Sequence, residues 1–183
     1  MGKLIIYTGP MKSGKTTALL DKYSSEKCSY QSPERLMLFK PIIDDRFSRY
    51  NVVTRDGKML RCNNVATIDD IVNIADKYDK VFIDEFQFLA GDVARLIDLS
   101  LNDKEIYIAG LNLTAERKPF GLMDKLFPYA TEINLLFGNC DNCGSIGNGI
   151  YTYFKGGKTQ DILIGEDNYM CVCSDCYKKL IKS

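Results

Sequence analysis

The sequence predicts an α/β fold built on a parallel β-sheet and followed by a small C-terminal domain. Five short apolar runs, each bounded by charged or turn residues, are separated by stretches of helical or mixed character. Continuous apolar strands that alternate with helices are typical of parallel sheets buried on both faces. The runs cover residues 3–9, 35–41, 80–85, 104–110 and 132–137.

Helices are expected between these strands. Residues 15 to about 30 follow a glycine-rich turn and begin as a helix. Thr67, with Asp70 three residues later, resembles a capping box, which predicts a helix through about residue 77. Residues 91–99 are expected to form another helix, and residues 44–66 a loop with short strands.

The composition of the chain changes after about Phe137, where glycines become frequent and two Cys-x-x-Cys pairs appear. A chain of 183 residues is long enough for one domain with a good core and a smaller appendage. We therefore expect an α/β domain over residues 1–137 and a second, smaller domain over residues 138–183.

The charges of the chain are balanced, with 24 Lys and Arg residues and 24 Asp and Glu residues. No global basic field steers such a protein toward nucleic acid or anionic lipid, so small-molecule partners are expected instead. The apolar stretch before Gly9 is too short for a signal-peptide core or a membrane span. This predicts a cytoplasmic protein with no membrane partner.

Residues 9–16 match the pattern Gly-x-x-x-x-Gly-Lys-Ser/Thr, directly after an apolar strand and at the start of a helix. In that setting backbone N–H groups surround the phosphates of a nucleoside triphosphate, the lysine reaches the outer phosphates and the final hydroxyl ligates Mg²⁺. A chance glycine-rich turn is the alternative, but the flanking strand and helix argue against it. The expected phosphate-binding residues are Gly9, Pro10, Met11, Lys12, Ser13, Gly14, Lys15, Thr16 and Thr17, with Thr16 also at the magnesium ion.

Two adjacent carboxylates, Asp84 and Glu85, end the run at residues 80–85. A phosphate-binding loop needs an acidic residue on a neighbouring strand to hold the metal, and Asp84 is suited to that role. Glu85 is then expected to overhang the crevice at the carboxyl ends of the strands, where it can take a proton from a hydroxyl group or water. The chain has no histidine for this task. A kinase or an NTPase is therefore predicted; a salt bridge of Glu85 at the sheet rim is the alternative.

Four of the seven cysteines form two Cys-x-x-Cys pairs, Cys140/Cys143 and Cys173/Cys176. In a reducing compartment this spacing favours a metal over disulfides. Four thiolates with no open position favour a structural, tetrahedral Zn²⁺. A redox pair or free thiols are alternatives, and Cys171 leaves open which thiol completes the set.

Between the cysteine pairs, glycines and the alternating runs at residues 150–154 and 160–165 predict a β-ribbon beside the metal. Zinc ribbons often bind nucleic acid, but lysines and acidic residues are equal in number from residue 139 to residue 183. This balance is a poor electrostatic match for a nucleic-acid partner. The ribbon is therefore expected to fix a loop over a small-molecule pocket.

Six motifs follow one another in a specific order along the chain. They are GPMKSGKTT at 9–17, KPIIDDR at 40–46, TRDG at 54–57, FIDEFQF at 82–88, RKPFG at 117–121, and the cysteine pairs around IYT and IGEDNYMCVC. Their order and spacing resemble the type II thymidine kinases over nearly the whole chain. The resemblance implies a RecA-like P-loop core with a zinc-bearing lasso that closes over a nucleoside. It also implies phosphorylation of the 5′-hydroxyl of thymidine by ATP to give dTMP in nucleotide salvage, by a homotetramer inhibited by its triphosphate end product.

The same resemblance implies roles for individual residues. It makes Glu85 the catalytic base and places Asp44 and Arg46 near the phosphates. By residue type alone, aromatic side chains and methionine are more often packing residues of a core, so only their motif positions suggest a binding role. The residues implied at the nucleoside are Met11, Gln87, Phe88, Phe120, Thr152, Ile164, Gly165 and Tyr169.

Several positions depart from the family pattern. Ala115 stands where an aromatic wall beside the base is usual, Asn112 and Leu113 stand where aspartate and glycine are usual, and Lys12 replaces an aromatic residue of the phosphate loop. Loss of a ring face removes aromatic packing and opens volume. A kinase for another or a modified deoxynucleoside is therefore an alternative.

Two further classes of protein stay open at this point. An ATP-driven NTPase that binds nucleic acid through a zinc ribbon would show hydrolysis stimulated by DNA and a salt-sensitive affinity for it. A noncatalytic nucleotide sensor would bind nucleotide without producing a nucleoside monophosphate. The balanced charge of both halves of the chain argues against the first of these.

Overall fold

The computed structural model describes residues 2–44, 50–54, 56–156 and 167–182, and it confirms the predicted α/β fold. At its centre is a six-stranded sheet with the order β5-β2-β6-β7-β1-β8. Every neighbouring pair in it is parallel, and all five apolar runs of the sequence supply strands. The strands are β1 (Lys3–Gly9), β2 (Leu36–Pro41), β5 (Asn63–Val65), β6 (Lys80–Ile83), β7 (Glu105–Leu111) and β8 (Glu132–Leu135).

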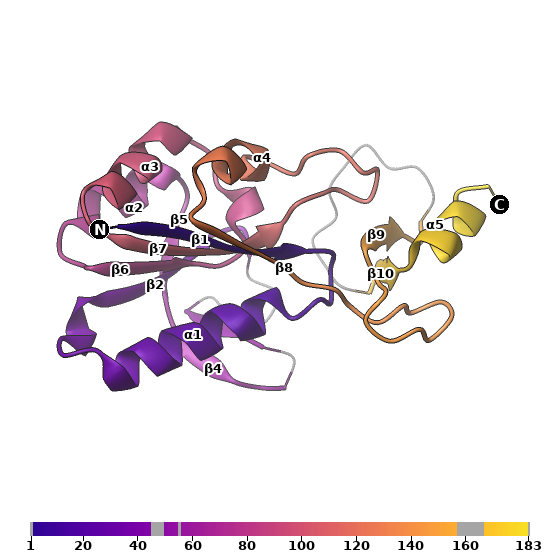
Figure 1. Ribbon diagram of the computed structural model, residues 1–183, viewed down its shortest axis with the longest axis horizontal. Coiled ribbons are helices and arrows are strands. Elements are labelled where there is room, and N and C mark those ends of the chain that lie inside the picture. The colour runs from indigo at the N-terminus through magenta and orange to yellow at the C-terminus, as the bar shows by residue number, and fades with distance from the viewer. Residues whose placement is uncertain (1, 45–49, 55, 157–166, 183) are drawn as a thin grey trace.

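Helices cover both faces of this sheet (Figure 1). The helix α1 (Lys15–Ser29) lies on one face, and α2 (Ile68–Ala75), α3 (Val93–Leu101) and α4 (Met123–Leu126) lie on the other. In the described part of the chain, no helix is both long enough and apolar enough to span a membrane.

Two apolar layers form the core, one on each face of the sheet. Neighbouring residues of β1 contribute to opposite layers, because successive side chains of a strand point to opposite faces. Leu4 and Ile6 pack under α2 and α3, whereas Ile5 packs under α1. In the layer under α1, the rings of Phe82 and Tyr107 stack with their centroids 4.5 Å apart. Continuous apolar runs were the sequence signal of this two-sided burial.

Side-chain caps fix where α2 and α3 begin. The backbone N–H of Asp70 donates to the Thr67 hydroxyl, and the backbone N–H of Thr67 donates to the Asp70 carboxylate. This is the capping box expected from the sequence. At α3 the Asp92 carboxylate accepts from the backbone N–H of Ala94 at 3.0 Å.

The segment between β2 and α2 contains short strands, as predicted. β3 (Asn51–Val53) and β4 (Met59–Arg61) form an antiparallel hairpin. β5 follows at once and pairs with β2 in the main sheet. Three short 3₁₀ helices complete the larger part of the chain: η1 (Pro33–Arg35), η2 (Phe86–Phe88) and η3 (Phe127–Tyr129).

The C-terminal segment has a sheet and a core of its own. β9 (Tyr151–Phe154) pairs antiparallel with β10 (Tyr169–Val172), and α5 (Ser174–Leu180) follows. Val172 and Tyr177 pack here with Cys140 and Cys176. The run at 160–165, expected as the second strand of the ribbon, lies outside the described residues, and the observed partner of β9 was not expected from the sequence. The division into domains at residues 137 and 138 stays a prediction.

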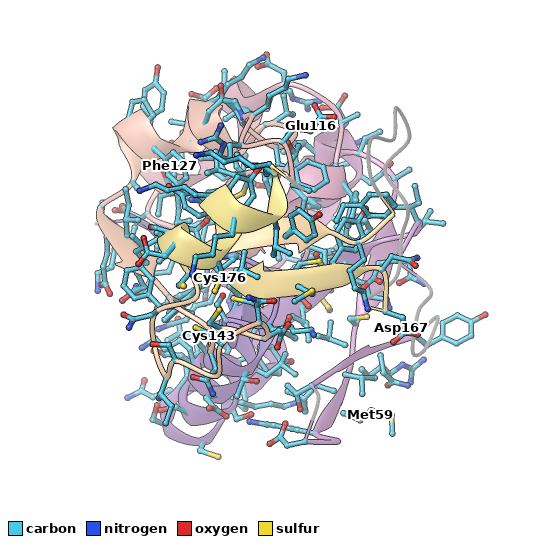
Figure 2. The ribbon with its side chains drawn as sticks, turned by 90° about the vertical axis from the view of Figure 1, so that its right-hand side faces the viewer. Met59, Glu116, Phe127, Cys143, Asp167 and Cys176 are labelled. Atoms are coloured by element: carbon cyan, nitrogen blue, oxygen red, sulfur yellow. The ribbon has the colours of Figure 1, made fainter. Side chains whose placement is uncertain are left out.

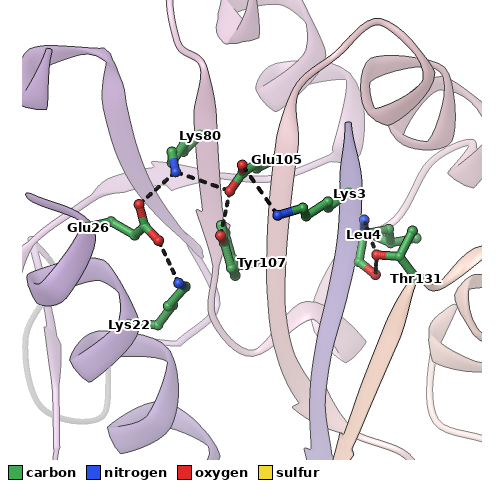
Figure 3. A network of polar contacts seen from close by, with 8 residues as sticks. All are labelled: Lys3, Leu4, Lys22, Glu26, Lys80, Glu105, Tyr107 and Thr131. Atoms are coloured by element: carbon green, nitrogen blue, oxygen red, sulfur yellow. Dashed lines mark hydrogen bonds and ion pairs between the residues drawn. The ribbon is translucent and has the colours of Figure 1, made fainter. Parts of the chain in front are cut away.

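A network of charges lies at the amino ends of β6 and β7, at the edge of the sheet opposite the phosphate-binding loop (Figure 3). The Lys80 ammonium donates to Glu26 at 2.6 Å and to Glu105 at 3.1 Å. The Tyr107 hydroxyl donates to the same Glu105 carboxylate at 2.6 Å. Burial lowers the pKa of Lys80, but the two carboxylates outweigh it and leave this pKa above its usual value. Lys80 is thus a buried cation whose charge is compensated from both sides.

Replacing Lys80 with Met should destabilise the fold by about 1–3 kcal/mol, because it removes the cation that lies between Glu26 and Glu105. The cation left to each carboxylate is then a more exposed lysine, Lys22 for Glu26 and Lys3 for Glu105. Urea denaturation measures this change. Lys118→Met is the matched control, since that lysine pairs with Glu116 while its side chain is 74% exposed. The control should change stability by less than about 0.5 kcal/mol. Equal effects of the two variants would contradict the compensating role of Lys80.

Candidate active site

The phosphate-binding loop joins the carboxyl end of β1 to the first turn of α1, as the sequence predicted. The loop enters its turn at Gly9, where φ is 144°. A Cβ atom there would lie only 2.1 Å from the Leu136 carbonyl oxygen, so glycine is required. Because α1 begins at Lys15, the unpaired N–H groups of its first turn face the loop. The arrangement is suited to surround an anion.

Two side chains of this loop, Lys15 and Thr16, have hydrogen-bond partners within the protein. The Lys15 ammonium, in a residue only 9% exposed, donates to the Pro10 carbonyl at 2.6 Å and lies 3.4 Å from the Ser13 hydroxyl. The Thr16 hydroxyl lies 3.2 Å from each carboxylate oxygen of Asp84. Residues 68 positions apart in the sequence therefore meet as predicted for a magnesium site.

Asp84 belongs to a group of interacting carboxylates. It is only 4% exposed. Burial, together with the negative charges of Glu85 and Asp44, raises its pKa to about 7. Asp44 is also buried and lies 3.8 Å from the Lys40 ammonium. Buried carboxylates that repel one another beside a hydroxyl group are the donor set that a hard divalent cation such as Mg²⁺ prefers.

Glu85 lies one residue after Asp84, at the start of η2, in a left-handed conformation with φ 50°. This conformation is uncommon for residues other than glycine and clusters at functional sites. The Gln87 side-chain amide donates to the Glu85 carboxylate at 2.5 Å. The amide oxygen of Gln87 accepts from the backbone N–H of Leu111 at 2.9 Å. Gln87 is neutral, so it orients the Glu85 carboxylate without neutralising its charge.

Two motifs that are distant in the sequence meet beside Glu85. The rings of Phe88 and Phe120 form an edge-to-face pair with centroids 5.5 Å apart. The backbone at Gly121, with φ 59°, approaches so closely that a Cβ atom would lie 2.2 Å from the Gln87 carbonyl oxygen. The structure thus brings Gln87, Phe88 and Phe120 together, as expected if they border one pocket. Phe120 is 7% exposed, so it also has the core-like burial that its residue type suggests.

The C-terminal segment reaches the phosphate-binding loop. The Thr152 hydroxyl of β9 accepts from the backbone N–H of Met11 at 3.0 Å. Tyr169 of β10 packs against Phe154 with ring centroids 5.2 Å apart. Two residues assigned to the nucleoside, Met11 and Thr152, are therefore in direct contact. Three other expected site residues lie outside the described residues: Arg46, Ile164 and Gly165.

Four cysteine sulfurs gather between the loop before β9 and the start of α5 (Figure 2). The sulfurs of Cys140, Cys143, Cys173 and Cys176 all lie within 4.8 Å of one another. Sulfurs bound to one Zn²⁺ at about 2.3 Å would lie about 3.8 Å apart in a tetrahedron. The Cys143 and Cys173 sulfurs are 3.9 Å apart. Cys171 is not part of the group, which answers the question that the sequence left open.

Hydrogen-bond donors around the cluster favour thiolates. The backbone N–H of Cys173 donates to the Cys140 sulfur at 3.3 Å, and the Asn142 amide donates to the Cys176 sulfur at 3.2 Å. Burial raises the pKa of Cys140, but backbone donors led by the Cys173 N–H outweigh it and lower the pKa to about 6. The donor set and the spacing both fit Zn²⁺.

Sequence reasoning missed contacts that shape the loop after β7. The Tyr177 hydroxyl of α5 donates to the Ala115 carbonyl at 2.8 Å, and the Arg117 guanidinium lies 5.2 Å from the Tyr177 ring centroid. The loop around Ala115, which lacks the usual aromatic wall, is therefore held by its backbone to the C-terminal helix. No pattern in the sequence predicted this contact, because it depends on how α5 packs after the cysteine pairs.

Comparison with known proteins identifies relatives over the whole chain. The family model described as "Thymidine kinase" matches residues 2–177. A thymidine kinase of Pseudothermotoga lettingae is 33% identical over 182 residues, covering 98% of this chain and 96% of that protein. One of Amsacta moorei entomopoxvirus is 36% identical over 179 residues, covering 92% and 94%. One of Bacteroides fragilis is 30% identical over 183 residues, covering 99% and 89%.

Proposed function

The chain belongs to the thymidine kinase family, and from this we propose that it transfers the γ-phosphoryl group of ATP to the 5′-hydroxyl of thymidine, giving dTMP and ADP. The observation that carries the proposal is the meeting of Thr16 and Asp84 at 3.2 Å, with Glu85 next in the chain. This arrangement supports the proposal, because a phosphate loop, a metal-holding carboxylate and a base would then share the carboxyl ends of the strands.

In the proposed reaction Glu85 is the general base. Its carboxylate, oriented by the Gln87 amide, takes the proton of the 5′-hydroxyl as the oxygen bonds to the γ-phosphorus. The bond from the γ-phosphorus to the β–γ bridging oxygen breaks, and ADP leaves with that electron pair. The left-handed backbone at Glu85 supports the role, since it turns the chain sharply at the end of β6.

The phosphate loop supplies positioning and charge compensation. Its backbone N–H groups, the α1 N-terminus and the Lys15 ammonium hold the phosphates of ATP. Thr16 and Asp84 would hold Mg²⁺, and Asp44 lies close enough to raise the pKa of Asp84. When bound, Mg²⁺ neutralises charge on the β- and γ-phosphates. Arg46 stays a predicted member of this group.

The thymidine site is proposed between the phosphate loop, η2 and the lasso. Phe88 and Phe120 are in contact at one side, and Met11 and Thr152 are in contact at the other. Tyr169 supports β9 from the neighbouring strand. Ile164 and Gly165 stay predicted residues of this site, as parts of the lasso.

A panel of nucleosides incubated with labelled ATP tests the proposed function. Thymidine should give a labelled monophosphate, and omission of Mg²⁺ or use of another phosphate donor shows what the reaction requires. The family membership does not favour a nucleic-acid-stimulated NTPase, and the panel includes single-stranded DNA as that alternative. ATP hydrolysis that rises with DNA and gives no nucleoside monophosphate would overturn the proposal.

We also propose that the four-cysteine cluster binds a structural Zn²⁺. Cys143→Ser should lower the metal content from about one zinc per chain and leave the remaining cluster thiols reactive. Cys143 is exposed, so the change removes a ligand without a cavity in the core. Cys28→Ser, at another exposed thiol, is the control and should keep its zinc. A wild-type protein that contains no zinc after expression with zinc supplied would contradict the proposal.

A homo-oligomer, tetrameric by resemblance, is proposed for the assembled protein. The edge strand β8 and the short segment that follows it expose Ile133, Leu135 and Phe137 by 48%, 52% and 49%. Exposed apolar residues on a sheet edge are typical of interaction surfaces. Light scattering that gives the mass of one 20.7 kDa chain would contradict this proposal. The cytoplasmic location and the end-product inhibition stay predictions.

A further inference from the structure

The phosphate-binding loop is tied to the cysteine cluster by a charged contact outside the proposed catalytic group. The Lys12 ammonium donates to the Asp141 carboxylate at 2.7 Å. These residues are 129 positions apart, and Asp141 stands between the cluster cysteines Cys140 and Cys143. A link of this kind connects the conformation of the loop to that of the cluster.

Both ends of the link are held in place. Asp141 also accepts from the backbone N–H of Cys171 at 2.9 Å, and its own N–H donates to the Cys171 carbonyl at 2.7 Å. These bonds fix the carboxylate relative to β10. At the other end, Lys12 adopts a left-handed conformation with φ 64°, which is disfavoured for a residue with a Cβ atom.

Two neighbouring contacts also hold the phosphate-binding loop against the C-terminal segment. Met11 donates its backbone N–H to Thr152, so consecutive loop residues are bound by the C-terminal segment. A Cβ atom on Gly138 would lie 3.1 Å from the Lys12 carbonyl oxygen, which shows how closely the chain packs against the loop at this point. The strained turn at Lys12 is therefore supported from outside the loop.

We propose that Lys12 is a positioning residue for the ATP site: its ion pair with Asp141 holds the phosphate-binding loop in the conformation that binds nucleotide. The inference rests on the proposed function, in which this loop binds the phosphates of ATP. In this role the Lys12 side chain acts through Asp141, whereas its backbone N–H stays a predicted part of the phosphate-binding loop. Loosening the pair lets the turn at Lys12 relax, so that the loop must be ordered again when nucleotide binds.

Lys12→Met and Asp141→Asn test this by removing one charge each at nearly constant shape. The side chains are 29% and 31% exposed, so each variant should weaken binding of a nonhydrolysable ATP analogue about two- to fivefold. The KM for ATP should rise in step, while the KM for thymidine stays near its wild-type value. Calorimetry measures the affinity, and the zinc content of each variant should equal that of the wild type.

The double variant and a conservative variant sharpen the test. Lys12→Met combined with Asp141→Asn should be no weaker than either single variant, because both remove the same contact. Lys12→Arg keeps the charge and should restore most of the affinity. Lys58→Met is the matched control: its ion pair with Asp21 spans 2.8 Å but does not touch the phosphate-binding loop, and it should leave nucleotide affinity unchanged.

Three results would overturn the inference. Unchanged affinity in Lys12→Met is the first. Tighter binding in Asp141→Asn is the second, because it would mean that a released Lys12 ammonium binds phosphate directly. Additive losses in the double variant are the third. A wild-type protein that binds the analogue but phosphorylates no nucleoside would overturn the proposed function alone, since the affinities still decide the role of Lys12.

Discussion

Replacing Glu85 with Gln should lower the turnover of thymidine by about two to four orders of magnitude, the range for loss of a general base. The amide has nearly the shape of the carboxylate but cannot accept the proton of the 5′-hydroxyl. The Gln87 amide can still donate to the side-chain oxygen of the new amide, so the left-handed turn at residue 85 should be kept. ATP affinity should stay within about twofold of wild type, because the phosphate loop does not depend on this side chain.

Two measurements separate this result from a general loss of structure. Single-turnover phosphoryl transfer reports the chemical step, and calorimetry with a nonhydrolysable ATP analogue reports binding. Glu116→Gln is the matched control, since that exposed glutamate pairs with Lys118 in the loop after β7. Near-wild-type transfer by Glu85→Gln would remove the proposed role of Glu85.

The parts of the site that sequence predicted are those fixed by motif and strand order. The glycine-rich loop predicted where Lys15 and Thr16 stand, because its backbone geometry is common to all such loops. Asp84 followed from its place at the end of a buried strand, since parallel strands end at one edge of the sheet. In the structure the Thr16 hydroxyl lies 3.2 Å from the Asp84 carboxylate, and their binding of Mg²⁺ stays a prediction.

The parts that sequence did not predict depend on the conformations of irregular segments. The bond from Gln87 to Glu85 requires a left-handed backbone at Glu85, which no residue pattern specifies. The contact of Tyr177 with Ala115 requires the position of α5. The strand β10 was not predicted from the sequence, where Cys171 only left open which thiol completes the metal set. In the structure Cys171 is a buried residue of this strand.

The Lys12 to Asp141 pair shows how a departure from a motif can carry information. In the sequence, Lys12 was only an unusual residue in a phosphate-binding loop. In the structure its charge is met by a carboxylate that lies within the cysteine cluster. Asp141 could not be predicted as the partner of Lys12, because the two residues are 129 positions apart and no sequence pattern shows that the fold brings them together.

Asp84 should limit the stability of the metal-free protein at neutral pH. Its folded pKa, about 7, lies above the value of about 4 in an unfolded chain. A raised carboxyl pKa gives a contribution to stability that is complete below about pH 4 and is lost as the pH rises through about 7. The wild-type protein without Mg²⁺ should therefore lose stability between these two values, because folding then opposes ionisation of a buried group beside Glu85 and Asp44.

Asp84→Asn removes this titration and should make the metal-free protein more stable by about 1–3 kcal/mol at pH 8, with little difference at pH 4. Urea denaturation in EDTA across this range measures the change, and Asp98→Asn, at an exposed carboxylate of α3, should follow the wild type. The same Asp84 variant should lose about 100-fold or more in turnover, because the proposed magnesium site then lacks its carboxylate. If the stability difference between Asp84→Asn and the wild type stays constant with pH, Asp84 is ionised at little cost in the folded chain. A gain in stability paired with a loss of turnover would instead show that the repulsion among Asp84, Glu85 and Asp44 is kept for binding the metal and not for folding.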